Sequence, residues 1–257
     1  MKVSIITATY NSAKTIDLTL DSVVGQSYKE IEHIIIDGNS SDDTIEIVRS
    51  YPHVAQVLSE PDKGIYDAMN KGLALATGDI IAILNSDDLF FDNNVVQKIV
   101  DRFQRDQCQV LYGNTIAGDM DALGNFTRVT RLVRPKAFKR RKFLFGWMPS
   151  HVSTYIHKDV YRKYGNFVDT FKIGADYELM LRFMFRHEVP SSYINEFCVK
   201  FRVGGISTST FKNKLVALSE AKKAWEMNNI KPYFFTVISK PIRALSNIII
   251  QKILPKS

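Results

Sequence analysis

Residues 80–91 read IIAILNSDDLFF, where an apolar run ends directly in the polar cluster Asn85-Ser86-Asp87-Asp88. A short apolar run that follows a glycine, here Gly78, is typical of a strand that is buried on both faces. Two neighbouring carboxylates at a strand end repel each other unless a cation or a helix N-terminus shares the site. This stretch therefore predicts a buried strand with a candidate site at its carboxyl end.

Strand and helix signals alternate around this stretch over the first hundred residues. We expect further strands at residues 3–8 and 31–36, and helices at residues 12–26, 41–50 and 65–76. Both of these strands also end in polar clusters, Thr9-Tyr10-Asn11 and Asp37-Gly38-Asn39-Ser40. The alternation predicts an α/β fold with a Rossmann-like, mostly parallel sheet flanked by helices. In such sheets ligands bind where the strands end.

The second half of the chain has a looser pattern. We expect strands at residues 110–112, 127–133 and 152–157, and helices at residues 158–164 and 176–187. Residues 232–257 combine many apolar side chains with only basic charges, are interrupted by Pro241 and are too polar to span a bilayer. They predict a C-terminal amphipathic helical tail that lies at a membrane interface, or else packs against the core or a second subunit.

Composition places the chain among ordinary globular proteins of one domain. Its 257 residues suffice for a sizeable core. Cys108 and Cys198 lie far apart and have no partner at metal-ligand spacing, which argues against disulfides and a zinc site. Because Met1-Lys2 leads straight into a strand-like segment, we expect no secretion signal and a cytoplasmic enzyme.

Much of the net charge of +7 lies in one short stretch that no acidic residue interrupts. We call it the basic stretch, and its residues are Arg128, Arg131, Arg134, Lys136, Lys139, Arg140, Arg141 and Lys142. It is either a solvated face or a surface for an anionic partner, such as a membrane or a pyrophosphate-linked substrate. The interleaved aromatic and basic residues of a nucleic-acid groove are not obvious, so we expect no nucleic acid partner.

Asp87 and Asp88 supply hard oxygen ligands. Such ligands suit Mg²⁺ or Mn²⁺ with positions left open for phosphate oxygens. Either aspartate could instead cap the helix that follows.

Four stretches together resemble the GT-A fold, family-2 inverting glycosyltransferases of bacterial cell-surface polysaccharide synthesis. They are SIITATYNSAKTIDLTLDSVVGQSYKEIEHIIIDGNSSDDT (4–44), EPDKGIYDAMNKGLALATGDIIAILNSDD (60–88), MPSHVSTYIHKDVYRKYGNF (148–167) and GADYELMLRF (174–183). The resemblance covers roughly residues 1 to 210 and includes the positions of the family's DxD metal motif and catalytic acid.

The resemblance implies a nucleotide-binding site at the ends of the first strands. Asp37 would hydrogen-bond the base, which favours a UDP-sugar because a carboxylate accepts from a ring N–H. The nucleotide-binding positions that the resemblance implies are Thr7, Ala8, Thr9, Tyr10, Asn11, Asp37, Lys63, Asn85, Ser86 and Asp87. Asp87 or Asp88 would contact the divalent ion. Asn85 departs from the family's DxD pattern, which removes one anionic ligand.

The resemblance also implies that Asp176 is the general base for direct displacement, hence inversion. Ala175 stands where the family usually has glutamate, and Glu178 is the alternative base. His151 and Arg202 would contact the acceptor or the diphosphate, with residues 204–207 as a flap.

From these residues we expect a glycosyltransferase that moves a sugar from a nucleotide-sugar donor to a glycan or lipid-linked acceptor. The alternatives are a nucleotide-sugar-binding protein without turnover and a nucleotidyltransferase. We divide the chain into a catalytic domain at residues 1–215, with halves at 1–106 and 107–215, and a tail at residues 216–257. The tail and the basic stretch predict a peripheral contact with the inner face of the cell membrane.

Overall fold

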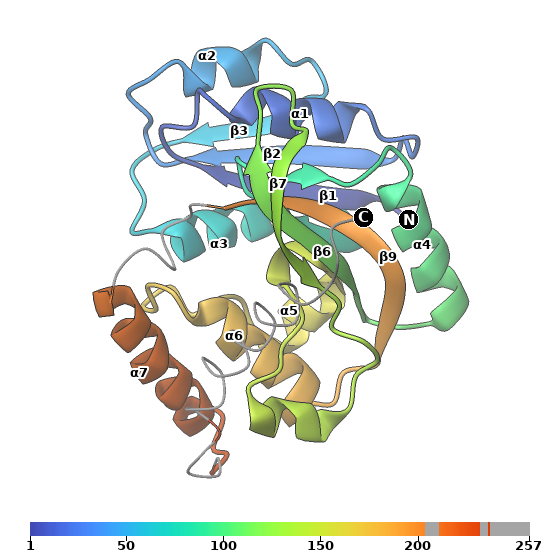
Figure 1. The fold of residues 1–257 in the computed structure, drawn as a ribbon, viewed down its shortest axis with the longest axis vertical. Coiled ribbons are helices and arrows are strands. Elements are labelled where there is room, and N and C mark those ends of the chain that lie inside the picture. Colours follow the sequence, from blue (N-terminus) through green and yellow to red (C-terminus); the bar gives the residue numbers. More distant parts are fainter. Residues whose placement is uncertain (204–210, 232–235, 237–257) are drawn as a thin grey trace.

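The strands of the first hundred residues form the parallel part of a nine-stranded sheet (Figure 1). The computed structural model describes residues 1–203, 211–231 and 236. The first four strands are β1 (Val3–Thr9), β2 (Ile31–Asp37), β3 (Val54–Ser59) and β4 (Ile80–Ile83). β1 pairs in parallel with β2 and β4, and β2 with β3. The sequence analysis missed β3, an edge strand that is only partly buried at alternate positions.

The second half extends this sheet and curls it. Its strands are β6 (Val110–Met120), β7 (Phe126–Val133), β8 (Thr154–His157) and β9 (Ser191–Arg202), and the short β5 (Leu89–Phe90) of the first half pairs antiparallel with β9. β8 runs antiparallel between β4 and β6, and β6 also pairs in parallel with β9. β6 and β7 form a long hairpin that projects over the sheet (Figure 1).

Helices cover both faces of the sheet because successive residues of β1 point to opposite sides. Ile6 packs into a core with Tyr66 and Met69 of the helix α3 (Ile65–Leu75). Ile5 packs on the opposite side, in a core with Ile99 of α4 (Val95–Asp106). The remaining helices of the first half, α1 (Ile16–Val24) and α2 (Thr44–Arg49), pack over Ile35 of β2. The α/β fold with a mostly parallel sheet flanked by helices is confirmed.

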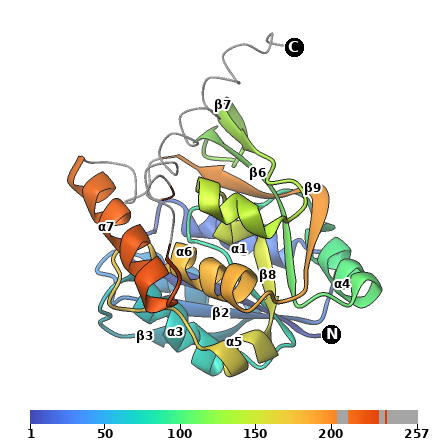
Figure 2. The same ribbon diagram turned by 90° about the horizontal axis from the view of Figure 1, so that it is seen from below.

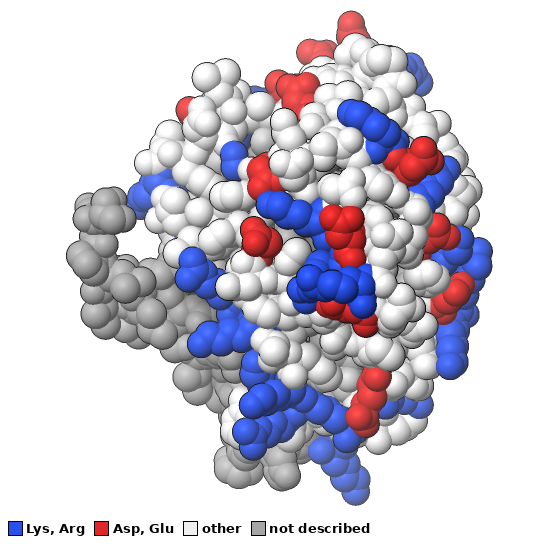
Figure 3. Space-filling model, turned by 90° about the vertical axis from the view of Figure 1, so that its right-hand side faces the viewer, with Lys and Arg blue, Asp and Glu red and all other residues white. Residues whose placement is uncertain are grey.

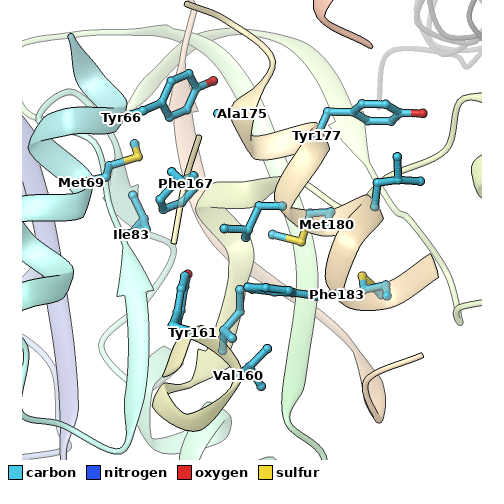
Figure 4. Packing of buried hydrophobic residues seen from close by; sticks show 14 of the residues in the cluster. Tyr66, Met69, Ile83, Val160, Tyr161, Phe167, Ala175, Tyr177, Met180 and Phe183 are labelled. Atoms are coloured by element: carbon cyan, nitrogen blue, oxygen red, sulfur yellow. The ribbon is translucent and has the colours of Figure 1, made fainter. Parts of the chain in front are cut away.

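The larger core is built by the short helices of the second half (Figures 2 and 4). These are η1 (Arg140–Phe145), η2 (His151–Ser153), α5 (Lys158–Tyr164), α6 (Ala175–Met180) and the π-helical turn η3 (Leu181–Arg186). The helix that we expected at residues 176–187 is therefore α6 continued by η3. Figure 4 shows Met180 and Phe183 of this segment facing the same apolar region as Tyr161, whereas Tyr177 points away from it.

The last described helix, α7 (Phe211–Met227), packs against α6 (Figure 2). Its Trp225 is fully buried and donates a hydrogen bond to the Tyr177 hydroxyl at 2.9 Å. The expected division between residues 215 and 216 falls inside this helix. The expected tail from residue 232 to 257 lies outside the described residues, apart from Thr236.

Candidate functional site

The polar clusters after β1, β2 and β4 lie side by side at one edge of the sheet, which we call the carboxyl edge. Thr9 is the register partner of Asp37, and Ile6 that of Ile83. The hydroxyl groups of Ser12 and Ser86 are 2.8 Å apart, which joins the loop after β1 to the loop after β4. Parallel pairing brings these segments together because it aligns the ends of neighbouring strands.

The predicted nucleotide residues after β1 divide between the interior and the surface. Thr7 is fully buried and lies 3.0 Å from the His33 ring, and Ala8 packs in the larger core. Thr9 is 4% exposed, and its hydroxyl has no hydrogen-bond partner among the described residues. Tyr10 is 63% exposed. Asn11 has a positive φ of 49°, and its side chain accepts a hydrogen bond from the Ser41 amide.

Asp37 is fully buried at the end of β2. Its carboxylate accepts hydrogen bonds from the Ser40 amide at 2.9 Å, from the Ser40 hydroxyl and from the Ser59 hydroxyl at 2.7 Å. These bonds hold the loop after β2 against the end of β3. The geometry gives Asp37 a structural role that the resemblance did not suggest, and leaves none of its surface open to a base.

The two aspartates after β4 differ in their surroundings. Asp88 is fully buried, and its oxygens accept from the Asn85 side-chain amide at 2.9 Å and from the Arg202 backbone amide at 3.2 Å. Burial, and then the neighbouring Asp87 charge, raise the pKa of Asp88 well above its ordinary value. Asp87 is half-buried, and its carboxylate forms no hydrogen bond or ion pair with another described residue. Burial also raises the pKa of Asp87.

This pair fits a divalent cation that takes few protein ligands. Among the described residues there is no group of three or more His, Cys, Asp or Glu side chains that could hold a metal. The Asp87 carboxylate has no partner among the described residues, and the buried Asp88 carboxyl group follows it in the chain. Mg²⁺ and Mn²⁺ sites of this kind use one or two carboxylates and complete their coordination with substrate phosphates and water.

Arg202, at the end of β9, lies at the same place as the aspartates. It donates its backbone amide to Asp88 and one guanidinium N–H to the Met120 carbonyl at 3.0 Å, and its charge favours the ionised form of Asp87. Its buried Nε–H has no partner among the described residues. The expected flap at residues 204–207 lies outside the described residues.

Asp176 and His151 come together although the chain separates them. Their carboxylate Oδ2 and ring Nδ1 lie 3.5 Å apart, and both side chains are partly exposed, at 20% and 24%. Burial lowers the pKa of His151, against the opposing effect of Asp176. β8 runs antiparallel to β4, with Tyr155 opposite Ala82, so His151 lies at the end of β4 from which the aspartates follow.

The loop before α6, the helix that carries Asp176 in its first turn, is hydrogen-bonded to two other helices. The Tyr66 hydroxyl of α3 donates to the Ile173 carbonyl at 2.5 Å, and the nearby Asp176 charge contributes, after burial, to a raised pKa of Tyr66. Glu220 of α7 accepts backbone N–H groups from Lys172, Ile173 and Gly174 at 2.7, 2.9 and 2.8 Å. The sequence analysis missed Tyr66 and Glu220, because nothing in a helical repeat indicates which distant loop a side chain will meet.

Glu178 and Lys63 complete the predicted set. Glu178 is buried and pairs with Arg182 at 2.8 Å and with the Asn228 amide at 3.0 Å, so its carboxylate is occupied inside the core. Lys63 is exposed before α3, and its ammonium group forms no hydrogen bond or ion pair with a described residue.

Solved structures with a similar fold are known. TarS residues 1–349 of S. aureus, solved with UDP-GlcNAc, superimposes with a TM-score of 0.69 at 15% identity and covers 96% of this chain and 73% of that chain. The mannosyltransferase PcManGT of Pyrobaculum calidifontis, solved with GDP-Man and Mn²⁺, gives 0.62 at 17% identity, covering 99% and 76%. This chain spans 39% of a longer TarS chain. At these identities the likeness shows the GT-A fold alone.

Sequence relatives carry the assignment further. The sequence model of Glycosyl transferase family 2 matches residues 4–165. An uncharacterized glycosyltransferase of Mycobacterium tuberculosis is 37% identical over 184 residues, which cover 70% of this chain and 68% of the relative. A PGL/p-HBAD biosynthesis glycosyltransferase of Mycobacterium bovis is 26% identical over 219 residues, covering 80% and 79%. The chain therefore belongs to glycosyl transferase family 2 and is a glycosyltransferase with the GT-A fold.

Proposed function

We propose that this glycosyltransferase moves a sugar from a nucleotide-sugar donor, a UDP-sugar, to a hydroxyl of a glycan or lipid-linked acceptor, with inversion and with Asp176 as general base. The observation that carries the proposal is the pairing of Asp176 with His151 at the end of β4, the strand that leads into Asp87 and Asp88. A base and a diphosphate site then lie at one edge of the sheet. Direct displacement needs this arrangement, because the hydroxyl attacks from the side opposite the leaving diphosphate.

Asp176 suits a base because its carboxylate is held and still reachable. One oxygen accepts the Tyr177 amide at 2.7 Å, and the other lies 3.5 Å from Nδ1 of the His151 ring. An acceptor hydroxyl that hydrogen-bonds to Asp176 would give up its proton to this carboxylate as the new bond forms.

The diphosphate of the donor would lie beside Asp87, Arg202 and Lys63. A divalent cation, when bound by Asp87 and the donor phosphates, would supply positive charge next to the leaving group. Asp88 would act from behind, since its bonds to Asn85 and to the Arg202 backbone keep the loop after β4 in place. Arg202 would offer its Nε–H, which has no partner among the described residues, to a phosphate oxygen.

A donor screen with Mn²⁺ or Mg²⁺ that follows nucleoside diphosphate release tests this function. Asp176→Asn should bind the donor normally and transfer at least about a hundredfold more slowly, as expected for a general base. Asp87→Asn should weaken metal-dependent donor binding. Asp169→Asn, an exposed aspartate near α6, is the matched control and should behave as the wild type. Full transfer by Asp176→Asn would remove Asp176 from the mechanism.

The same assay separates the alternatives. A nucleotidyltransferase would release pyrophosphate instead of a nucleoside diphosphate, and a binding protein without turnover would release neither. Inversion is tested in a separate experiment, which determines the anomeric configuration of the product.

We also propose a peripheral membrane contact through the basic stretch, which would bring the enzyme to a lipid-linked acceptor. Some of its cations are engaged: Arg128 pairs with Asp119 at 2.9 Å and Arg140 with Glu188 at 3.5 Å. Lys136, Lys139 and Arg141 are exposed and form no ion pair with described residues, and the neighbouring Phe145 is 51% exposed. Figure 3 shows basic side chains gathered on the lower part of one face. None of the described helices is long and apolar enough to cross a bilayer.

A further inference from the structure

Gly38, directly after β2, has no side chain, and another residue fills the space that a side chain would take. A Cβ atom built on Gly38 would lie 2.6 Å from Oδ2 of Asp62 and 3.4 Å from Cδ2 of Tyr10. Asp62 belongs to the loop between β3 and α3, and Tyr10 follows β1. Three loops of the carboxyl edge thus place a backbone surface, a carboxylate and an aromatic ring around one point.

The two oxygens of Asp62 are not equivalent. Oδ1 accepts the Gly64 amide at 2.8 Å and is fixed by this bond. Oδ2, the atom that faces Gly38, forms no hydrogen bond or ion pair with a described residue. The adjacent Tyr10 ring is 63% exposed. An unused acceptor beside an exposed ring is suited to a flat, polar partner.

We propose that Asp62, and not Asp37, reads the nucleobase of the donor, by accepting a ring N–H through Oδ2 while the base lies against Tyr10 and the backbone of Gly38. The inference rests on the proposed nucleotide-sugar function. Asp37 is closed off by Ser40 and Ser59 and is fully buried, so the loop after β3 supplies the carboxylate in its place. Asp62 is thereby a specificity-determining residue.

The chemistry restricts the donor class. Uracil, thymine and guanine each carry a ring N–H that a carboxylate can accept, whereas cytosine and adenine present a lone pair at the corresponding ring nitrogen. A carboxylate facing that lone pair would be repelled. The site should therefore take diphosphates of uridine, thymidine or guanosine and reject those of cytidine and adenosine.

Calorimetric titration of the full chain with UDP, dTDP, GDP, CDP and ADP in the presence of Mg²⁺ tests the selection. The tightest ligand is then compared with its analogue methylated at the ring nitrogen, 3-methyl-UDP, 3-methyl-dTDP or 1-methyl-GDP. We expect the methyl group to weaken binding to the wild type by about ten- to a hundredfold, because it removes a hydrogen bond to a charged acceptor. Tight binding of CDP or ADP would overturn the inference.

Asp62→Asn is the decisive variant. Its side-chain oxygen can keep the bond to the Gly64 amide, which places the NH₂ group where Oδ2 was. Two donors would then face each other, so the penalty for methylation should fall to about twofold or less and CDP should bind more tightly than before. Gly38→Ala should also lower the penalty for methylation, since the new Cβ would displace the Asp62 carboxylate. The backbone at this position can accept alanine.

Asp43→Asn is the matched control, because Asp43 is exposed at the start of α2 and its side chain forms no capping bond. It should keep the full methylation penalty. If Asp62→Asn also keeps that penalty while the wild type binds UDP, dTDP or GDP, the inference fails and the proposed function stands. If none of the five diphosphates binds the wild type, the proposed function itself fails.

Discussion

At the scale of single residues, the two neighbouring aspartates do different work. Asp88 is fully buried and bonded to Asn85 and to the Arg202 backbone, whereas Asp87 keeps a carboxylate without a described partner. Two such charges at a strand end destabilise the protein in the absence of a cation, because neither can be solvated fully. The bonds of Asp88 hold the loop after β4 in place, and we propose that Asp87 binds the ligand.

Asp88→Asn should show this cost as a pH dependence. The pKa of Asp88 is raised in the folded protein, so between the unfolded and folded pKa values the native state holds the extra proton and stability falls as pH rises. The variant has no carboxyl group at this position, so it does not lose stability in this way as pH rises. The melting temperature of the variant minus that of the wild type should therefore be larger at about pH 8 than at about pH 4 in EDTA. Differential scanning calorimetry measures the difference, and a value independent of pH would contradict the assignment.

At the scale of elements, α7 positions the loop before α6, the helix that carries Asp176. The Glu220 carboxylate accepts three successive backbone N–H groups just before α6, and Trp225 anchors the same helix in the core. Bonds to an ionised acceptor are stronger than neutral ones, and this one fixes the start of α6 from a separate part of the chain. α7 therefore holds the start of α6, and the boundary that we expected at residue 215 lies inside α7.

Glu220→Ala should lower kcat by about tenfold or more, since a small displacement of a catalytic group is costly, while the Kd for the donor stays unchanged. Glu220→Gln keeps one acceptor oxygen and should restore part of the loss. The matched control is Glu226→Ala, on the same helix, where the side chain forms an exposed pair with Lys222 at 3.7 Å and no other ion pair with the described residues. Equal loss of kcat and donor affinity in Glu220→Ala would indicate general unfolding instead of positioning.

At the scale of the whole molecule, the net charge of +7 is not spread evenly over the surface. The exposed cations Lys136, Lys139 and Arg141 lie on either side of the start of η1, close in sequence to the exposed Phe145. Each cation near an anionic bilayer contributes about 1 kcal/mol at moderate salt. Because these cations are clustered, we expect binding to an anionic bilayer to depend on these three positions and not only on the total charge of the protein.

Flotation with phosphatidylcholine vesicles that contain phosphatidylglycerol tests this membrane contact. Replacing Lys136, Lys139 and Arg141 together by Gln should abolish most of the binding. The same net change at Arg162, Lys163 and Lys222 should leave most of it in place, because these side chains lie on α5 and α7. If both triple variants bind equally well, overall charge and not the basic stretch holds the protein at the vesicle.

The sequence by itself determined the alternation of strands and helices in the first hundred residues and the polar clusters at three strand ends. Both are local properties: apolar runs such as residues 80–84 must be buried, and register then aligns their ends. The family resemblance named the candidate residues, and the sequence patterns left β3 out because an edge strand buries only alternate side chains.

Only the tertiary structure decided which of these side chains meet. His151 reaches Asp176 because β8 inserts beside β4, and Asp62 fills the space at Gly38 because two loops from different strands end together. Glu220 accepts hydrogen bonds from the loop before α6, although 46 to 48 residues of chain separate it from that loop. Such contacts depend on pairing order and helix packing over the whole molecule, and no local pattern of residues contains that information.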